Sequence, residues 1–173
     1  MDLRGGRTAA EQPPPAKRPR TSGSGTGKRK VKVKKQLAEG SFGTVFLAYD
    51  YHTSQLHALK QIKVQRGNVD MLAAARSEIS FMHTIPPHRN ITRYVASSTH
   101  EDPGGRDITF YILMEYCGGV RLSDEKRKRP SEREVVTIMT HVLDAVDHMH
   151  SLKPPVAHRD IKLDNVLDDG HGT

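Results

Sequence analysis

The chain has 173 residues, enough for one ordinary domain, with a 35% apolar fraction and no Trp. Its single cysteine excludes an intramolecular disulfide and fits a reducing compartment, and no apolar run approaches the roughly 20 residues of a membrane span. The net charge of +7 is concentrated in residues 1–35, which hold 11 Lys/Arg and 2 Asp/Glu, whereas residues 36–173 hold 16 and 18. We therefore expect a soluble, cytoplasmic protein with one basic arm.

Residues 1–30 form this arm and are rich in Pro, Gly, Ser and Thr. Such a segment cannot bury enough apolar surface to offset the entropy of ordering it, so we predict disorder. Two basic clusters, at 17–20 and 28–30, resemble a two-part nuclear import signal or a patch for nucleic acid or acidic lipid. The alternative is a solvated tail without a dedicated partner. Nothing in residues 36–173 favours a nucleic-acid-binding fold, so we do not expect nucleic acid as the partner.

From residue 31 the sequence changes to short β-rich runs. The runs VKVKKQL, TVFLAYD and LHALKQIKV predict a three-strand antiparallel meander, with the glycines of AEGSFG between the first two strands. The segment NVDMLAAARSEISFMHTI then predicts a helix that Pro86 and Pro87 end. The apolar face of this helix consists of Met71, Ala75, Ile79 and Met82.

Two more strands, ITRYVASS and DITFYILMEYC, are predicted on either side of a turn at EDPGGRD. After Gly118 and Gly119, a polar and basic connection leads to a second helix over residues 131–151. Ser131 as the N-cap, with Glu134 three residues later, predicts a capping box. The apolar stripe of this helix consists of Val135, Met139, Val142, Val146 and Met149.

Three features before residue 80 are candidates for phosphate chemistry. The small residues of LAEGSFGTV (37–45) let backbone N–H groups approach phosphate oxygens, although a plain turn is the simpler interpretation. Lys60 shares a strand face with Ala58, and its ammonium either reaches solvent or holds phosphate charge beneath the glycine hairpin. Glu78 borders the apolar face of the first helix, and either stays solvated or points inward and pairs with Lys60.

The stretch HRDIKLDN is the most specific signal in the chain. Its three polar residues suit three different tasks in phosphoryl transfer. Asp160 can accept a hydroxyl proton, Lys162 can neutralise a transferring phosphoryl group, and Asn165 can ligate a divalent cation through its amide oxygen.

In order and spacing, AEGSFGTV, HALK and HRDIKLDN resemble the signature set of protein kinases. A Lys two residues after Asp160 is typical of serine/threonine kinases. The stretches LAEGSFGTVFLAYD, HRNITRYVASS and KPPVAHRDIKLDN are similar to the Numb-associated kinase family, which includes adaptor-associated and cyclin-G-associated kinases. The resemblance implies an α+β, bilobal fold. Residues 31–115 would form a five-strand N-lobe with one helix, and residues 116–173 the hinge, the first helix of the C-lobe and the catalytic loop.

The resemblance also implies ATP and Mg²⁺ as cofactors and a protein Ser or Thr as substrate, with endocytic adaptor proteins as partners implied by the subfamily. Lys60 would contact the α- and β-phosphates and pair with Glu78. Asp160 would orient the substrate hydroxyl, Lys162 would lie near the γ-phosphate, and Asn165 would hold one Mg²⁺.

Adenine binding is implied for residues of both lobes. Met114 would be the gatekeeper, and the backbone of Glu115 and Cys117 would hydrogen-bond the adenine edge. Four apolar side chains would enclose the base, namely Leu37, Val45, Ala58 and Leu167. The glycine loop would contribute Ala38, Gly40 and Gly43. Ala38 departs from the family pattern, which usually has Gly there, and a methyl group is tolerated if φ stays negative.

A second departure concerns the Asp-Phe-Gly motif, which is expected roughly a dozen residues after Asn165. Residues 168–170 read Asp-Asp-Gly, which is too early and lacks the Phe. We therefore expect this chain to be a truncated fragment, the N-terminal part of a kinase domain, and we expect residues 1–173 alone to lack kinase activity. The alternative is a catalytically inactive short isoform that acts as a protein-binding module.

Overall fold

The computed structural model describes residues 29–40, 42–125 and 127–168. The strands are β1 (Val31–Gly40), β2 (Gly43–Asp50), β3 (Gln55–Gln65), β4 (Tyr94–Glu101), β5 (Asp107–Glu115), β6 (Val120–Arg121) and β7 (Leu167–Asp168). The helices are α1 (Val69–Thr84), α2 (Glu132–His150) and the 3-10 helix η1 (Leu163–Asn165). The predicted disorder of residues 1–28 lies outside the described residues. Arg29, which we assigned to the arm, forms an ion pair with buried Asp50 at 3.0 Å.

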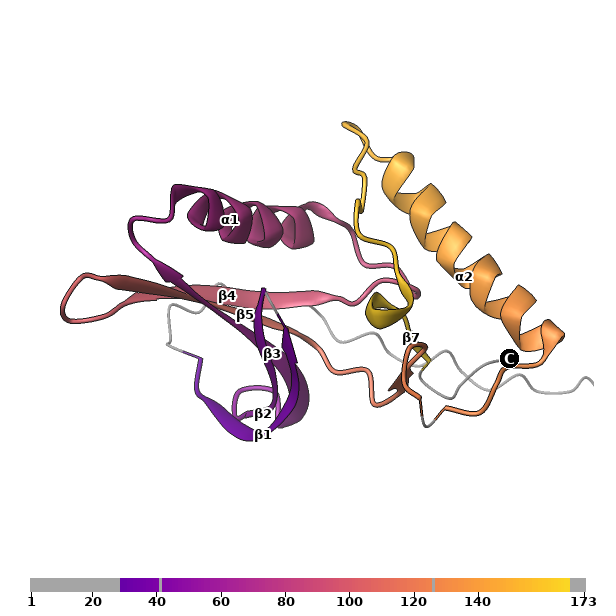
Figure 1. The fold of residues 1–173 in the computed structure, drawn as a ribbon, viewed down its shortest axis with the longest axis horizontal. Helices are drawn as coiled ribbons and strands as arrows, with labels where there is room; N and C mark the ends of the chain where they lie inside the picture. Colours follow the sequence, from indigo (N-terminus) through magenta and orange to yellow (C-terminus); the bar gives the residue numbers. More distant parts are fainter. Residues whose placement is uncertain (1–28, 41, 126, 169–173) are drawn as a thin grey trace, which may run out of the picture.

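Five strands form one antiparallel sheet in the order β1-β2-β3-β5-β4, and α1 lies across one face of it (Figure 1). This confirms the predicted α+β fold with a five-strand sheet and one helix. The central strand β3 carries Lys60, whose cross-strand neighbours are Val45 on β2 and Ile112 on β5. Directly paired residues share a sheet face, so Lys60 projects from the same face as these two side chains.

The main core lies between the sheet and α1. Its buried residues are Ile62, Val64, Ala75, Ile108, Phe110 and Ile112. Met71, Ile79 and Met82 of α1 pack against this cluster, which confirms the predicted apolar face. The Asn68 side chain caps the helix by accepting a hydrogen bond from the Met71 N–H at 3.1 Å. This packing fixes the rotation of α1, and therefore the direction in which its polar residues point.

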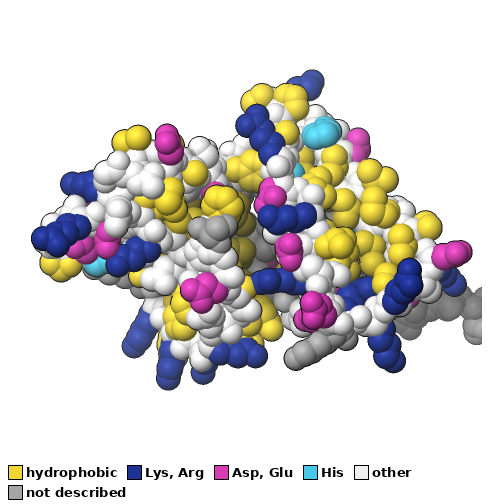
Figure 2. All heavy atoms as spheres, in the orientation of Figure 1, with side chains coloured by type: hydrophobic (Ala, Val, Ile, Leu, Met, Phe, Trp, Pro, Cys, Tyr) yellow, Lys and Arg dark blue, Asp and Glu magenta, His cyan; other side chains and the backbone are white. Residues whose placement is uncertain are grey.

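The predicted capping box begins α2. The Glu134 N–H donates to Ser131 Oγ at 3.3 Å, and the Ser131 N–H donates to Glu134 Oε2 at 2.7 Å. Near the other end Met149 is buried. The helix is different between Val135 and Leu143, where four apolar side chains are open to solvent and form a visible patch over α2 (Figure 2). These exposed residues are Val135, Val136, Met139 and Leu143. Among the described residues, no helix is long and apolar enough to cross a membrane.

A polypeptide limited to residues 31–173 is expected to self-associate through this patch. Val136 is 65% exposed and Leu143 is 60% exposed, and each would gain about 1.5–3 kcal/mol on full burial. We expect size-exclusion chromatography to show oligomers, and the double variant Val136→Glu, Leu143→Lys to raise the monomer fraction. A monomer of unsubstituted 31–173 with a sharp cooperative thermal melt would contradict this expectation.

The two described glycines of the β1–β2 hairpin have different environments. A Cβ on Gly43 would lie 2.3 Å from the backbone oxygen of Gln61 on β3, and Gly43 has a φ of +123°. A Cβ on Gly40 would meet no atom within 4 Å. Gly43 is therefore required by the close approach of two strands, whereas Gly40 faces open space.

Gly43→Ala is expected to destabilise the protein, because the new methyl group forces β2 away from β3. The expected loss of unfolding free energy is about 1–3 kcal/mol, measured by urea denaturation of the intact protein. Gly40→Ala is the matched control, and we expect it to be neutral or to gain up to about 1 kcal/mol. Equal destabilisation by the two substitutions would show that the Gln61 contact is not what selects glycine.

Candidate active site

An ion pair joins the sheet to α1. The Lys60 ammonium lies 2.6 Å from Glu78 Oε1 and 2.9 Å from Oε2, so both carboxylate oxygens hold it. The side chains are 19% and 31% exposed, respectively. Partial burial strengthens the attraction between the two charges and restricts the motion of the ammonium. The predicted inward position of Glu78 is therefore present, and the alternatives of a solvated Lys60 and a solvated Glu78 are wrong.

A second polar group surrounds Asp160 in the loop before η1. Lys162 Nζ lies 3.1 Å from Asp160 Oδ1. The Asn165 amide donates to both the backbone oxygen and Oδ2 of Asp160, each at 2.8 Å. The loop turns sharply here because Arg159 has a φ of +63°, an uncommon value for a residue with a side chain. The three residues that the sequence singled out in HRDIKLDN are thus assembled around one carboxylate.

These neighbours stabilise the ionised form of the Asp160 carboxyl. The Lys162 ammonium holds the pKa of this carboxyl below its usual range, and the Asn165 amide lowers the pKa further by donating to the charged form. A carboxylate that stays charged keeps its oxygens available as hydrogen-bond acceptors. The group can therefore receive and orient a hydroxyl at neutral pH.

Lys162→Met is expected to raise the pKa of the Asp160 carboxyl toward its ordinary value, because the largest cause of the lowering is removed. A ¹³C NMR titration of the aspartate carboxyl carbons in the intact protein measures this change. The protonation step of Asp160 should move to higher pH in the variant. Lys153→Met, at an exposed lysine, is the control. An unchanged Asp160 titration in Lys162→Met would contradict the assigned cause.

The side chains expected to contact adenine lie partly on one sheet face. Ala58 is paired with Met114, and Val45 with Lys60, so these four residues project from the same face around β3. Leu37 lies on β1, while Leu167 lies on β7 beyond the catalytic loop. The negative φ expected for Ala38 is present, since the described non-glycine residues with positive φ are Ser54 and Arg159. Among the described residues, no hydrogen bond or ion pair joins the Lys60 pair directly to the Asp160 group.

The sequence was compared with known protein families to find which family has this arrangement of polar groups. Residues 31–173 match the sequence family described as "Protein kinase domain". The chain belongs to the protein kinase family. The match covers both the sheet with the Lys60–Glu78 pair and the loop with Asp160, so the two polar groups are parts of one kinase domain.

Curated relatives of this kinase chain carry serine/threonine kinase names. A Dictyostelium discoideum protein named "Probable serine/threonine-protein kinase" is 37% identical over 141 residues, covering 78% of this chain and 12% of the relative. A serine/threonine-protein kinase of Schizosaccharomyces pombe is 35% identical over 145 residues, with 82% and 15% covered. Another, from Caenorhabditis elegans and named SULU, is 34% identical over 140 residues, with 79% and 13% covered. The chain thus spans a small part of the length of these relatives.

The hinge side of the kinase domain is tied to the catalytic loop in a way that the sequence did not reveal. We predicted a polar and basic connection after Gly119, and within it β6 pairs with β7, with Val120 opposite Asp168. The Ser123 hydroxyl also donates to Asp164 Oδ1 at 2.6 Å. One basic residue of the connection after Gly119, Arg127, forms an ion pair with Asp168 next to the catalytic loop. These contacts fix the far end of the loop that carries Asp160.

A second tether joins the segment after α1 to α2, and our sequence analysis missed it as well. Arg89 and Asn90 both donate to Asp144 Oδ2 on α2, the Asn90 amide at 2.9 Å. The Phe81 ring of α1 meets the His158 ring of the catalytic loop edge to face, with centroids 6.3 Å apart. Figure 1 shows the catalytic segment running between α1 and α2. The two polar groups of the site are therefore connected through the packing of α1.

Proposed function

We propose that the intact protein transfers the γ-phosphoryl group of ATP to Ser or Thr hydroxyls of other proteins. Protein kinases generally use ATP and Mg²⁺. The observation that carries the proposal is the pair of assembled charge groups, Lys60 with Glu78 and Asp160 with Lys162 and Asn165. Phosphoryl transfer depends on positioning and on charge stabilisation more than on covalent chemistry, and these groups supply both.

Lys60 is the proposed contact for the nucleotide phosphates. Its ammonium is held in one position by both Glu78 oxygens, on the sheet face that also carries Val45 of β2. The open space at Gly40 lets phosphate oxygens approach the backbone of the β1–β2 hairpin. At the hinge, the Glu115 N–H already donates to the Arg93 oxygen at 2.9 Å. We therefore assign adenine recognition at Glu115 to its carbonyl oxygen.

The proposed environment of adenine combines the gatekeeper Met114 with backbone groups at Glu115 and Cys117. The proposed enclosing side chains and loop residues are Leu37, Ala38, Gly43, Val45, Ala58 and Leu167. Support comes from the shared sheet face of Ala58 and Met114. An apolar pocket with a few fixed polar groups is the usual form of a cofactor site.

Asp160 is the proposed group that orients the substrate hydroxyl and accepts its proton. Lys162, now paired with Asp160, is proposed to turn toward the γ-phosphate. Asn165 fits a metal ligand, because both side-chain hydrogen bonds to Asp160 use Nδ2 and the amide oxygen makes none to a described residue. Amide oxygens suit hard cations such as Mg²⁺, which when bound neutralises phosphate charge. These residues thus provide one metal ligand, one proton acceptor and one mobile cation.

The proposed substrate class is a protein Ser or Thr, supported by the Lys two residues after Asp160 and by the names of the relatives. At the subfamily level, the resemblance to Numb-associated kinases supports endocytic adaptor proteins as substrates. We propose a cytoplasmic location, with nuclear import through the basic arm as the alternative. Fluorescence microscopy of the tagged intact protein, with and without residues 1–28, separates these two locations.

Incubating the intact protein with [γ-³²P]ATP, Mg²⁺, casein and myelin basic protein tests the activity. Phosphoamino acid analysis should show label on phosphoserine or phosphothreonine. Label on phosphotyrosine alone would overturn the serine/threonine assignment. Nucleotide binding without any transfer would overturn the activity and favour the catalytically inactive, protein-binding alternative.

A further inference from the structure

A row of exposed lysines lies at β1, the edge of the sheet opposite β4 (Figure 1). The row consists of Lys30, Lys32, Lys34 and Lys35. None of these four side chains forms an ion pair with another described residue, and the carboxylate of Asp50 on β2 is buried and paired with Arg29. Figure 2 shows Lys and Arg side chains gathered at the lower end of the sheet, where Figure 1 places β1 and β2. This edge therefore carries positive charge that no described carboxylate neutralises.

Two tyrosine rings of the β2 strand and the turn after it hold the lysines on one side of β1. Lys30 Nζ lies 5.5 Å from the centroid of the Tyr51 ring, and Lys34 Nζ lies 5.7 Å from that of Tyr49. The two rings meet edge to face, with centroids 5.1 Å apart. Lys32 is directly opposite Tyr49, so it shares this face of the sheet. Cation–π attraction restrains the ammonium groups, and three of them are therefore gathered on one surface.

An apolar side chain belongs to the same surface. Leu56 on β3 is directly opposite Tyr49, and it is 45% exposed. We call the whole surface the lysine face, and it consists of Lys30, Lys32, Lys34, Tyr49, Tyr51 and Leu56. Tyrosine rings are enriched at the headgroup level of lipid bilayers, and clusters of basic residues bind anionic headgroups. The lysine face combines both features with an exposed leucine.

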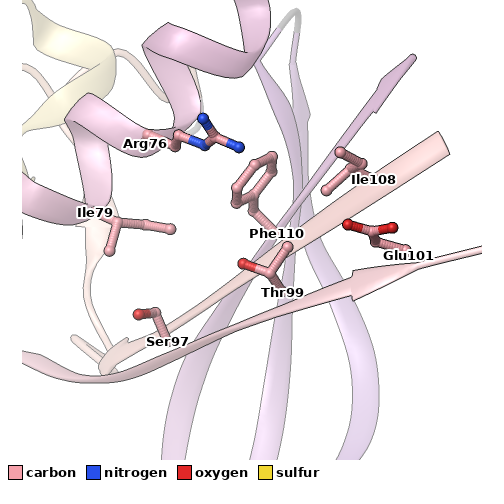
Figure 3. Close-up of a pocket in the computed structure, with 7 residues that line it drawn as sticks. All are labelled: Arg76, Ile79, Ser97, Thr99, Glu101, Ile108 and Phe110. Atoms are coloured by element: carbon pink, nitrogen blue, oxygen red, sulfur yellow. The ribbon is translucent and has the colours of Figure 1, made fainter. Parts of the chain in front are cut away.

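Other charged parts of the sheet region carry both signs. Arg76 and Glu101 line the same hollow beside α1 (Figure 3). Lys63 on β3 lies 2.8 Å from the carboxylate of Asp107. Carboxylates at these places repel an anionic surface, whereas the lysine face contains none. The excess of positive charge is thus local to the β1 edge.

We propose that the lysine face docks the protein on the surface of an anionic lipid bilayer. Alternate residues of a strand are roughly 6.6 Å apart, so Lys30, Lys32 and Lys34 present three ammonium groups in a row to the headgroup phosphates. Leu56 and the tyrosine rings would enter the region between the headgroups. The basic residues that precede Lys30 in the sequence add charge of the same sign. Docking would set where the kinase acts and would leave the transfer chemistry unchanged.

The layout of the lysine face favours a bilayer over two other anionic partners. Single-stranded nucleic acids are held by stacking of bases on free aromatic rings, but Tyr49 and Tyr51 pack against each other and each lies beneath an ammonium group. An acidic peptide added along the free edge of β1 would reach the lysines. It would not cover Leu56, because β3 is two strand spacings, roughly 10 Å, from β1. A flat surface covers both.

Cosedimentation of the intact protein with lipid vesicles, in the absence of ATP, tests the proposal. We expect binding to vesicles of phosphatidylcholine and phosphatidylserine in equal parts, and none to phosphatidylcholine alone. The triple variant Lys30→Gln, Lys32→Gln, Lys34→Gln should lower the partition coefficient about 100-fold, because each basic residue near an anionic surface strengthens binding roughly fivefold. Leu56→Asp is an independent variant that places a negative charge on the same face, and it should lower the partition coefficient about tenfold.

Two further variants separate the lysine face from net charge. The charge-matched control is Arg76→Gln, Arg133→Gln, Lys153→Gln, which removes three positive charges from exposed residues elsewhere. We expect it to bind the anionic vesicles nearly as well as the unsubstituted protein. The variant in which Lys30, Lys32 and Lys34 are all replaced by Arg keeps the charge and should also bind normally. Circular dichroism melts confirm that each variant is folded.

Four results would overturn the docking surface. The protein could bind both kinds of vesicle equally, the triple Gln variant could bind as well as the unsubstituted protein, or the charge-matched control could lose as much binding as the triple Gln variant. Tighter binding to DNA or to polyglutamate than to the anionic vesicles, at the same salt concentration, would replace the bilayer by a soluble polyanion. No nucleotide or substrate is present, so failure of the kinase assay leaves this test independent.

Discussion

Asp160→Asn is expected to lower the rate of phosphoryl transfer by about 10²–10⁴-fold, the usual contribution of a positioned general base. The substitution keeps an oxygen that can accept the Asn165 amide hydrogen bond, which now measures 2.8 Å. It removes the negative charge that orients the hydroxyl and accepts its proton. We therefore expect nucleotide affinity to remain close to that of the unsubstituted protein, while turnover falls. Initial rates of ³²P incorporation at saturating ATP measure the effect.

Asp164→Asn is the matched control for this experiment. Asp164 lies four residues later in the same loop, and it accepts a hydrogen bond from Ser123 at the exposed surface. Its carboxylate makes no hydrogen bond or ion pair with Asp160, Lys162 or Asn165 in the described structure. We expect a small change in rate. A similar loss in both variants would point to damage to the loop, and undiminished activity of Asp160→Asn would remove Asp160 from the mechanism.

Lys60→Met is expected to weaken ATP binding by about 10- to 100-fold. Hydrogen bonds to charged groups contribute about 1.5–3 kcal/mol, and the substitution removes the ammonium while leaving the Glu78 carboxylate near the phosphates. Glu78→Gln should have a smaller effect, because the ammonium remains but is no longer held by two charged oxygens. Titration with a fluorescent ATP analogue measures both affinities.

The double variant Lys60→Met, Glu78→Gln tests whether the two residues act as one unit in ATP binding. Residues that act as one unit give non-additive effects, so Lys60→Met should cost less when Glu78 is already Gln. Lys63→Met is the control, since Lys63 is 67% exposed and pairs with Asp107, and its odd spacing from Lys60 places it on the opposite sheet face. Strict additivity, or an equal loss from Lys63→Met, would show that the Lys60–Glu78 pair does not hold the nucleotide.

Local patterns predicted most of this fold. The alternating runs gave the strands, and the spacing of Met71, Ala75, Ile79 and Met82 gave the face of α1 that packs on the sheet. A short signal with a defined geometry, the Ser131–Glu134 capping box, located the start of α2. The Lys60–Glu78 pair was also predictable, because strand alternation and helix periodicity each fix the direction of one side chain.

Contacts between distant polar residues were not predictable in this way. The pairing of Val120 with Asp168 and the hydrogen bond from Asn90 to Asp144 join segments about 50 residues apart that carry no periodic signal. Their polar residues are common in loops, so the sequence alone does not indicate a partner. The need for glycine at position 43 depends on the Gln61 oxygen of a neighbouring strand, and a contact between strands is not visible in the local sequence.

A crystal structure of the intact protein with a non-hydrolysable ATP analogue and Mg²⁺ would test whether the Lys60 pair and the Asp160 group hold one nucleotide. We expect one bound nucleotide, with Lys60 Nζ within hydrogen-bond distance of its phosphates and the amide oxygen of Asn165 ligating the metal. The Glu78 carboxylate should remain paired with Lys60. A nucleotide bound elsewhere, or one that contacts neither Lys60 nor Asn165, would show that these residues do not form one ATP site.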